Sequence, residues 1–488
     1  MAENCNALQD SSLRDRVFLP NGAPYTERLE TYWSVSAALE PWCMVMPATA
    51  DEASLVIRVL TKNECPFGIR GGGHGADAYS NGIDAGVTID FGFMNATTYD
   101  ADRKIVSIQP GTHWQPVYET LSPLGVTVTG GRGGTVGASG FISGGGNSFH
   151  SASHGFAADN VQNFELVLGN GSLINANANE NPDLWQAMKG GSGNFGLITR
   201  YDMYAIEFPD PSSTDIWGGL IIHDVAVQDD VIDCYVDFAE NSGKDQNSTS
   251  IVFWGYIPAL GGMVLNVALE NTINAVSPPA FDCYLKTTGV ISKSLRSAPM
   301  AEITLELGSG QPAGFRNIWY TGAYGNDARI IKFAVDKHAS MVAELQKVMS
   351  ADSGFNTLCM FQPISPNMVQ HGIDRGGNIM GLEDHVFKAA DGSSKTGVMF
   401  LATFAVKGVE NEKKAAPLVQ DWQDSIDAFA DSLDLNWNWR YLNYANQKQN
   451  VLASFGEKAI AKMRAASAKY DPDQVFQKLR KTGHRIPM

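Results

Sequence analysis

The chain has 488 residues, of which 44% are hydrophobic and 18% are charged, and its formal net charge is −16. This balance is typical of a folded protein with two or three structural units around large cores, and it excludes a disordered chain. An acidic chain lacks the basic face that binds nucleic acid, and the sequence contains no run of about 18 apolar residues that could span a membrane. We therefore expect neither a nucleic-acid partner nor a membrane partner.

The first 200 residues alternate between helix and strand patterns. Thr49 or Asp51 can cap the first clear helix, because either side chain accepts a hydrogen bond from an exposed backbone amide. The patterns predict helices at 53–60 and 114–121 and strands at 66–69, 86–90, 104–108 and 126–128. Residues 164–174 predict a hairpin with Asn-Gly at its turn. This alternation is typical of an α/β or α+β unit.

Glycine is concentrated in three clusters in the first half of the chain, at residues 71–75, 130–146 and 190–196. Glycine lets a backbone approach a ligand closely, and successive amides in such loops bind anionic oxygens. The clusters are separated by strand patterns, so we expect several loops to converge on one extended ligand. The second cluster matches neither the usual dinucleotide-binding fingerprint nor a P-loop.

The residue composition of the sequence changes between residues 206 and 430. Aromatic and apolar strand patterns such as 250–256 alternate with helix patterns such as 331–349, which predicts a large sheet backed by helices. From residue 441 the chain continues to a helix at 457–468 and a turn at 470–472. No internal repeat is evident.

Five motifs in order resemble the FAD-binding domain of the vanillyl-alcohol-oxidase superfamily. They are Arg70-Gly71-Gly72-Gly73-His74, Thr135-Val136-Gly137, Ser143-Gly144-Gly145-Gly146, Asp159-Asn160-Val161 and Gly193-Asn194-Phe195-Gly196. The later run Tyr441-Leu442-Asn443-Tyr444-Ala445, followed by Tyr470-Asp471-Pro472 and Val475-Phe476, resembles the terminal segment of the berberine-bridge-enzyme-like branch. The resemblance extends over residues 40–200 and 437–480, and it includes secreted fungal FAD-linked oxidases.

The resemblance implies an α+β fold with a two-part FAD-binding domain. Residues 1–205 would form its first part, 206–436 a substrate-binding domain with a large antiparallel sheet, and 437–488 a segment that returns to the FAD domain. The residues that would bind FAD are Arg70, Gly71, Gly72, Gly73, His74, Gly75, Thr135, Val136, Gly137, Gly140, Gly144, Gly145, Asn147, Gly155, Asp159, Asn160, Val161, Gly193, Asn194, Gly196, Ile198 and Asn443.

His74 is implied to be the residue that is joined covalently to the flavin. Such a bond prevents loss of the cofactor, and an electron-withdrawing imidazolyl substituent makes the ring easier to reduce. Many relatives have a second link through a cysteine at the position of Gly133, so we predict a single covalent link through His74. Val136 matches the position where a small residue admits oxygen, which implies an oxidase that reduces O2 to H2O2.

Oxidation of a substrate requires a base for the departing O–H or N–H proton. Tyr441 is the first catalytic candidate and Tyr444 the second, with Asn443 positioning the flavin; an acid from the sheet of the substrate domain is an alternative. A phenol is a poor base unless a cation stabilises its phenolate, and Arg440 should point to the opposite face of a strand. Both tyrosines could instead be ordinary core residues.

The metal-binding candidates are weak. His150 and His154 have the spacing of two ligands on a helix, but the sequence places no third ligand near them. We therefore expect no metal site. The absence of a CxxC pair also argues against a zinc site or a thioredoxin-like redox centre.

The cysteines and sequons favour the secretory pathway. The six cysteines could all be buried thiols, but a disulfide from Cys5 to Cys43 would hold the N-terminus, and both match cysteines of the secreted relatives. Asn95, Asn170 and Asn247 begin glycosylation sequons. The first residues lack the pattern of a signal peptide, so either the protein is intracellular or its leader has been replaced by an initiating Met. The cysteines and sequons favour the second alternative.

We expect an FAD-dependent oxidase that takes a hydride from an alcohol or amine carbon of a small organic molecule and passes the electrons to O2. Its partners would be that small-molecule substrate and O2, and its state a monomer or weak dimer. An alternative is a flavin-dependent oxidative cyclase of secondary metabolism. A second alternative is a flavoprotein whose cofactor organises a pocket for binding or for non-redox cyclisation.

Overall fold

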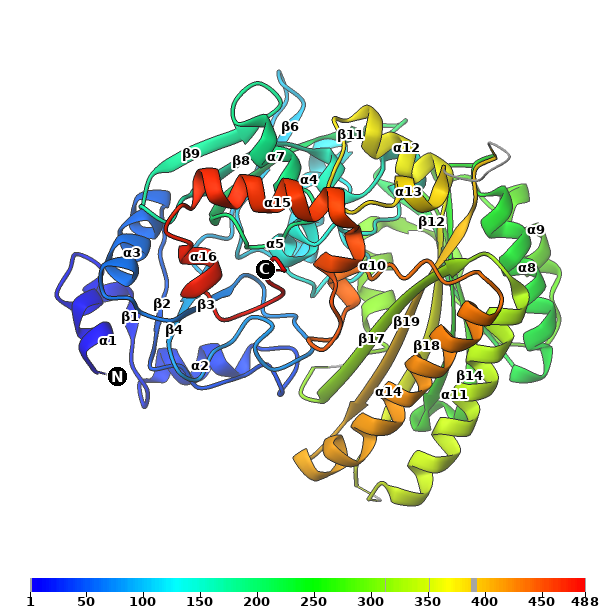
Figure 1. Cartoon of the computed structure of the whole chain (residues 1–488). Coiled ribbons are helices and arrows are strands. Elements are labelled where there is room, and N and C mark those ends of the chain that lie inside the picture. The colour runs from blue at the N-terminus through cyan, green and yellow to red at the C-terminus, as the bar shows by residue number, and fades with distance from the viewer. Residues whose placement is uncertain (1, 312, 351, 388–392, 488) are drawn as a thin grey trace.

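The N-terminal part of the chain forms a four-stranded sheet around a β-α-β unit (Figure 1). The computed structural model describes residues 2–311, 313–350, 352–387 and 393–487. The strands lie in the order β1 (Val17–Phe18), β2 (Cys43–Val45), β4 (Val87–Asp90) and β3 (Phe67–Arg70), and β4 pairs in parallel with β2 and β3. Helix α3 (Ala50–Lys62) follows β2, and the Thr49 side chain caps it by accepting from Glu52 N. The first glycine cluster therefore begins at the carboxyl end of β3, where ligands bind in such sheets.

The other two glycine clusters belong to a five-stranded antiparallel sheet and its connections. The strand order is β5 (Thr97–Asp100), β6 (Ile105–Ile108), β10 (Leu197–Tyr204), β8 (Val161–Val167) and β9 (Leu173–Asn177). The predicted hairpin is confirmed as β8 and β9. The helices of this part are α4 (Trp114–Leu121), α5 (Ala138–Ser143), α6 (Ser151–His154) and α7 (Pro182–Met188).

The middle of the chain forms a large antiparallel sheet, as the sequence predicted. Its strand order is β15 (Val290–Lys293), β12 (Asp215–His223), β14 (Gly262–Asn271), β13 (Ser248–Ile257), β18 (Asn356–Ile364), β19 (Gly397–Val406) and β17 (Arg316–Gly325). Strand β16 (Arg296–Pro299) also pairs with β12. The chain enters this sheet at Asp215, close to the expected boundary at residue 206.

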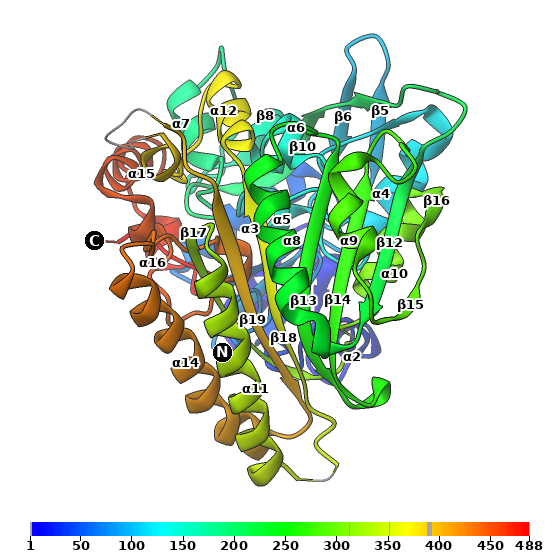
Figure 2. The same ribbon diagram turned by 90° about the vertical axis from the view of Figure 1, so that its right-hand side faces the viewer.

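Three long helices cover one face of the eight-stranded sheet and leave the other face toward the glycine-rich loops (Figure 2). They are α8 (Gln228–Asn241), α11 (Ala328–Val348) and α14 (Val409–Ser432). Apolar side chains such as Tyr235, Ile331 and Trp422 join these helices to the sheet in one buried core. Successive side chains of a strand point to opposite faces, so alternate residues are directed away from the helices and toward the loops.

The C-terminal segment returns to the N-terminal sheet, as the resemblance implied. In Figure 1 the red helices α15 (Glu457–Tyr470) and α16 (Val475–Lys478) lie beside the blue and cyan parts of the chain. Phe67 of β3 forms a parallel bridge with Arg480, and Phe67 also packs edge-on against Phe476 at 5.9 Å between ring centroids. The first glycine cluster therefore lies beside residues more than 400 positions later in the chain.

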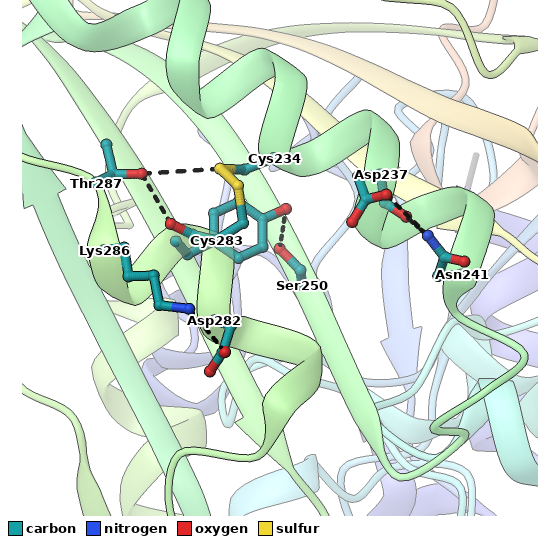
Figure 3. Close-up of a disulfide and its surroundings, with 9 residues drawn as sticks. Cys234, Asp237, Asn241, Ser250, Asp282, Cys283, Lys286 and Thr287 are labelled. Atoms are coloured by element: carbon teal, nitrogen blue, oxygen red, sulfur yellow. Dashed lines mark hydrogen bonds and ion pairs between the residues drawn. A yellow bond between two sulfur atoms is a disulfide. The ribbon is translucent and has the colours of Figure 1, made fainter.

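Two disulfides fix outer parts of the molecule. The predicted bond between Cys5 and Cys43 is confirmed, and it ties α1 (Ala2–Gln9) to β2. A second disulfide, which the sequence did not assign, joins Cys234 of α8 to Cys283 of α9 (Asp282–Lys286), as Figure 3 shows. None of the helices within the described ranges has the length and apolar content that a membrane crossing requires.

Candidate active site

A cavity of about 420 Å³ lies between the glycine-rich loops and the free face of the eight-stranded sheet. One wall is made of residues 71–77, 131–141 and 192–198, together with the C-terminal residues 480–484. The opposite wall is made of side chains from strands β13, β14, β17, β18 and β19. The segment 441–445 lies at the junction of the two walls.

The glycine wall depends on close contact between two backbones. A Cβ atom placed on Gly72 would lie 2.4 Å from the Gly137 Cα atom, and one on Gly137 would lie 2.6 Å from the Gly72 Cα atom. Gly73 adopts the left-handed region with φ of 75° beside the Arg70 guanidinium. Glycine is required at these positions because any side chain would separate the two loops.

Other glycines of this wall leave space for a ligand. A Cβ atom on Gly140 would meet nothing within 4 Å, and one on Gly193 would come no closer than 3.8 Å to any other group. Both residues line the cavity, so their missing side chains form a cradle along it. A backbone-lined cradle of this kind fits a long, flat cofactor that carries a pyrophosphate, since exposed amides can bind its oxygens.

His74 lies at the end of the first glycine cluster, with its imidazole stacked on Trp33. The two ring centroids are 4.4 Å apart and the planes differ by 9°. Thr135 Oγ1 lies 3.4 Å from His74 Nε2, so the first and second glycine clusters meet at this histidine. Burial, together with the neighbouring His113, lowers the pKa of His74 to about 4. The imidazole is therefore neutral at physiological pH and keeps a nucleophilic nitrogen.

Tyr444 forms a polar corner with two residues that the sequence did not single out. Arg132 Nη2 donates to the Tyr444 hydroxyl over 3.1 Å, and Gln362 Nε2 donates to the same oxygen over 3.1 Å. Arg132 also donates to Gln362 Oε1, which accepts a further hydrogen bond of 3.0 Å from Asn147 Nδ2. Arg132 is the one charged residue in the second glycine cluster, and that could have marked it. Gln362 has no comparable signal in the sequence.

Tyr441 has a different environment from Tyr444. Its ring is buried, and its hydroxyl accepts a hydrogen bond of 2.6 Å from Asn147 N. Burial raises the pKa of Tyr441 well above its usual value of 10, and the neighbouring Tyr444 adds to this effect. Arg440 points away from both tyrosines, as expected, and pairs with Asp427 at 2.6 Å. The protonated hydroxyl of Tyr441 therefore serves to hold the loop at Asn147.

Asn443 and Asp77 connect the C-terminal segment to the glycine wall. Asn443 Nδ2 donates to the carbonyls of Gly140 and Phe141, at 3.0 and 3.1 Å. The Asp77 carboxylate accepts from Asn446 Nδ2 at 3.2 Å and from Gln447 N at 3.1 Å. The Asp77 contacts tie the residues after Tyr444 to the loop after His74, and the Asn443 contacts tie the same segment to the second glycine cluster.

Most of the sequence-predicted residues meet at this cavity. Tyr441 and Tyr444 line it, together with Gly71, Gly72, Gly73, His74, Gly75, Thr135, Val136, Gly137, Gly140, Asn147, Gly193, Gly196, Ile198 and Asn443. A second group lies behind the wall: Arg70, Gly144, Gly145, Gly155, Asp159, Asn160, Val161 and Asn194.

The residues behind the wall hold the loops in place. The buried Arg70 guanidinium pairs with the Asp90 carboxylate at 3.1 Å. Asp159 accepts from Phe156 N at 2.9 Å, and Asn160 Nδ2 donates to Phe156 O at 2.8 Å. Asn194 accepts from the buried Arg480 at 2.7 Å. Their side chains are thus committed to the protein itself.

The histidine pair with metal-ligand spacing is packed within the protein. His150 and His154 lie edge to face, with ring centroids 5.8 Å apart. Burial lowers the pKa of His150 to about 3. Within the ranges that the structure describes, no group of three or more His, Cys, Asp or Glu side chains could hold a metal ion.

Comparison with known proteins identifies the class of this cavity. Residues 41–177 match the family model described as an FAD binding domain. This range contains the first two glycine clusters and His74. Together with the cradle, it defines the protein as an FAD-linked oxidoreductase.

The full-length relatives show the family more closely. The chain is 33% identical over 490 residues to FAD-dependent monooxygenase sdcF of Emericella nidulans, covering 100% of this chain and 99% of the relative. It is 33% identical over 481 residues to FAD-dependent monooxygenase drtC of Aspergillus calidoustus, covering 98% of this chain and 89% of the relative. The chain therefore belongs to the same family of FAD-dependent proteins as these two fungal relatives.

Solved structures share the fold at low sequence identity. Xylooligosaccharide oxidase from Myceliophthora thermophila superposes with a TM-score of 0.76 at 17% identity, covering 99% of this chain and 100% of that chain. Berberine bridge enzyme from Eschscholzia californica superposes with a TM-score of 0.75 at 16% identity, covering 100% of both chains. These similarities confirm the predicted α+β architecture.

Proposed function

We propose that this protein is an oxidase that takes a hydride from an alcohol or amine carbon of a small organic molecule and reduces O2 to H2O2. The observation that carries this proposal is the polar corner at Tyr444, where a guanidinium donates to a phenol oxygen inside the cavity. Bound FAD supplies the acceptor for the hydride and the route of both electrons to O2. The substrate loses one hydride and one proton, and O2 gains both as H2O2.

We assign the role of base to Tyr444 and a supporting role to Tyr441. A phenol accepts a proton efficiently only when its phenolate is stabilised, and the Tyr444 oxygen receives two donors, from Arg132 and Gln362. Tyr441 lacks a cationic donor in its hydrogen bond to Asn147 N, and its burial keeps it protonated. Asn443 would position the flavin through the glycine loop that it holds.

We further propose that His74 carries the flavin through a single covalent bond. Its neutral imidazole can act as a nucleophile, and Trp33 fixes the plane of the ring. Gly133 lines the cavity where many relatives have a second cysteinyl link, and glycine offers no thiolate there. The division into an FAD-binding domain at 1–205 and 437–488 and a substrate domain at 206–436 is part of the same proposal.

A secretory location accords with the cysteines and two of the sequons. Disulfides form in oxidising compartments, and the chain has two. Asn95 and Asn170 are exposed, and Asn170 lies in the tight turn between β8 and β9, so both could accept a glycan. Asn247 is half-buried and less suited to modification.

The names of the fungal relatives, FAD-dependent monooxygenases, favour a second candidate, monooxygenation, in which one oxygen atom enters the product. That reaction needs two electrons besides those in the C–H bond that is attacked, so a reductant or the substrate itself must supply them. Turnover under 18O2 separates the two reactions. The oxidase places the label in H2O2 and releases one H2O2 per substrate, whereas a monooxygenase places one labelled atom in the organic product.

The proposed oxidation is tested by adding candidate alcohols and amines to the holoenzyme without oxygen. An oxidase substrate bleaches the yellow flavin, and readmitting air restores the colour with release of one H2O2 per substrate. A flavoprotein whose cofactor only shapes a pocket would keep its oxidised spectrum while it converted the substrate. That result would contradict the redox assignment.

A further inference from the structure

We propose that the substrate is an apolar, carbon-rich molecule that presents an acidic hydroxyl, of a phenol or an enol, to Arg132. This inference rests on the proposed oxidation in the same cavity, and it names the substrate class which that oxidation would take. Two independent observations support it. The first is the apolar composition of the sheet wall, the cavity wall formed by strands β13, β14, β17, β18 and β19; the second is that the Arg132 guanidinium hydrogen-bonds to neutral groups.

The described side chains that the sheet contributes to the cavity are aliphatic, aromatic or thioether groups, and their one N–H group is the Trp319 indole. These side chains are Ile251, Phe253, Ile257, Ala268, Trp319, Leu358, Met360 and Leu401. The strand register makes them one patch, since Ile251 pairs with Ala268, Phe253 with Met360, and Met360 with Leu401.

Several members of this patch still have surface to bury. Phe253, Ile257, Trp319 and Met360 are only partly buried, although the sheet around them is a closed core. Their exposed carbon faces the cavity, so an apolar ligand would remove that carbon from water and gain affinity in proportion to the area covered. A patch of this kind selects for carbon surface.

The polar side chains on the same face of the sheet are not available to a sugar. Gln362 is fully buried and already hydrogen-bonded to Arg132, Tyr444 and Asn147. Glu270 and Asn266 share the face through their alternation with Ala268, but both are buried, with 0% and 3% of their surface exposed. Each sugar hydroxyl that lost water against this wall without a partner would lower the affinity by about 5- to 100-fold. A polyol is therefore a poor occupant.

Arg132 supplies a positive charge that no ionised carboxylate of the described residues contacts, since burial raises the pKa of the nearby Glu270 to about 8 and keeps it mostly protonated. Its hydrogen bonds go to neutral groups, the Gln362 amide and the Tyr444 hydroxyl. Within the described part of the chain, no carboxylate oxygen lies within 4.0 Å of this guanidinium, although buried ion pairs such as Arg70 with Asp90 occur nearby. An unpaired guanidinium beside an apolar wall attracts an oxygen that carries negative charge and repels a cationic amine.

The two observations combine at one corner of the cavity. Arg132 lies within 3.1 Å of the proposed base Tyr444, so a hydroxyl bound there would face both an acceptor for its proton and a donor for the resulting oxyanion. The apolar part of the molecule would extend over Phe253 and Met360. The carbon that bears a phenol or enol hydroxyl has no hydrogen, so the hydride would leave from an alcohol or amine carbon conjugated with that hydroxyl. The substrate then loses this hydride and the hydroxyl proton, which keeps the balance of the proposed oxidation.

The test is calorimetric titration of the wild-type holoenzyme with four probes that need not be turned over. They are 2-naphthol, 2-methoxynaphthalene, 2-(aminomethyl)naphthalene and cellobiose. We expect 2-naphthol to bind, and capping its hydroxyl to weaken binding by about tenfold or more, as loss of a charge-assisted hydrogen bond does. The cationic amine should be weaker still, and cellobiose should give no binding heat.

Variants then assign the selectivity to its source. Arg132→Gln should bring 2-naphthol and 2-methoxynaphthalene to within about threefold of each other, because the charge is gone. Ile257→Ser should weaken both ligands alike and preserve their ratio. Arg200→Gln, which removes a half-exposed guanidinium paired with Glu165 and Asp202 outside the cavity, serves as the matched control and should change neither.

The proposal is overturned if cellobiose or the amine binds as tightly as 2-naphthol, if 2-naphthol does not bind, or if Arg132→Gln preserves the preference for the hydroxyl. If the Arg132→Gln variant does not bind flavin, the binding of the four probes to wild-type protein and to the Arg132→Lys variant still tests the proposed substrate class. Lysine keeps the charge and should keep the preference. Because binding is measured without turnover, selective binding with no redox activity would contradict only the proposed oxidation.

Discussion

The two walls of the cavity are built on opposite principles. The glycine wall depends on the lack of side chains. Without them the two backbones can approach each other at Gly72 and Gly137, and open space remains at Gly140. The sheet wall works through side chains that are present and partly exposed, such as Phe253 and Met360. In this protein the proposed cofactor wall is specified by its glycine content. The proposed substrate wall is specified by the register of its strands and the shape of their side chains.

The largest expected effect lies at the junction of the walls, where the two tyrosines have different roles. Tyr444→Phe should slow flavin reduction by the substrate about 10²- to 10⁴-fold, because it removes a proton acceptor that is positioned in the cavity. Tyr441→Phe should cost much less in the same step, since it removes one hydrogen bond to Asn147 N. Anaerobic stopped-flow measurement of flavin reduction compares the two. An equal or larger loss in Tyr441→Phe would reverse the assignment.

The glycine wall should be intolerant of even one methyl group where the backbones meet. Gly72→Ala would place a Cβ atom 2.4 Å from the Gly137 Cα atom, and overpacking of this kind costs about 1–3 kcal/mol in the free energy of unfolding. Gly310→Ala is the matched control, since a Cβ atom there meets nothing within 4 Å. Thermal denaturation of both variants measures the difference. Equal melting temperatures would show that the contact is not needed.

Val136 lies on the glycine wall, and its predicted role concerns O2. Val136→Leu should slow reoxidation of the reduced flavin by air about tenfold, a change of about 1.4 kcal/mol in the barrier, while reduction by the substrate changes less. The physical reason is that a larger side chain narrows the approach of O2. Separate stopped-flow measurements of the two half-reactions check it. Comparable losses in both would count against a role in oxygen access.

The eight-stranded sheet has a buried acid, Glu270 of β14, whose effect should be seen in stability. Burial, opposed by Arg132 and assisted by Glu306, raises the pKa of Glu270 to about 8. The folded protein keeps a proton that the unfolded chain loses near pH 4.5, so stability falls as the pH rises from about 5 to about 8. Glu270→Gln cannot ionise and should gain on the order of 1 kcal/mol at pH 8, with little gain at pH 5.

Urea denaturation of wild type and Glu270→Gln at pH 5 and pH 8 measures this dependence. The matched control is Glu306→Gln, because Glu306 is half-buried and already paired with Arg296, and its removal should not produce the same pH profile. A constant difference between Glu270→Gln and wild type at both pH values would mean that the carboxyl ionises at its ordinary pKa.

The sequence predicted much of the glycine wall because its constraints are local. The clusters around Gly72, Gly137 and Gly193 identify loops that must pass close to a ligand, and His74 follows directly in the chain. The same reasoning assigned residues such as Asp159 and Asn194 to the cofactor, which stays a prediction, and the structure shows their side chains hydrogen-bonded to the backbone of their own loops. Sequence spacing cannot separate a residue that touches a ligand from one that orders the turn beside it.

The polar corner could not be predicted because its members come from distant parts of the chain. Gln362 and Tyr444 are 82 positions apart, and Arg132 reaches Tyr444 across 312 positions. From the sequence, Arg440 was the cation considered for the two tyrosines. The cation that contacts Tyr444 in the structure is Arg132, which lies in a glycine-rich loop. The apolar sheet wall was equally hidden, since its strands alternate between two apolar faces and the pattern does not say which one borders a cavity.

The most direct test of the proposed assignment is the mass of the denatured protein. Wild-type protein purified with its flavin, unfolded in acid and washed, should be heavier than its polypeptide by one FAD, and the added mass should map to the peptide that contains His74. His74→Ala should have the polypeptide mass alone, with the flavin in the supernatant. Wild-type protein that releases all its FAD, or that carries it on another residue, would contradict the assignment of His74 as the single anchor.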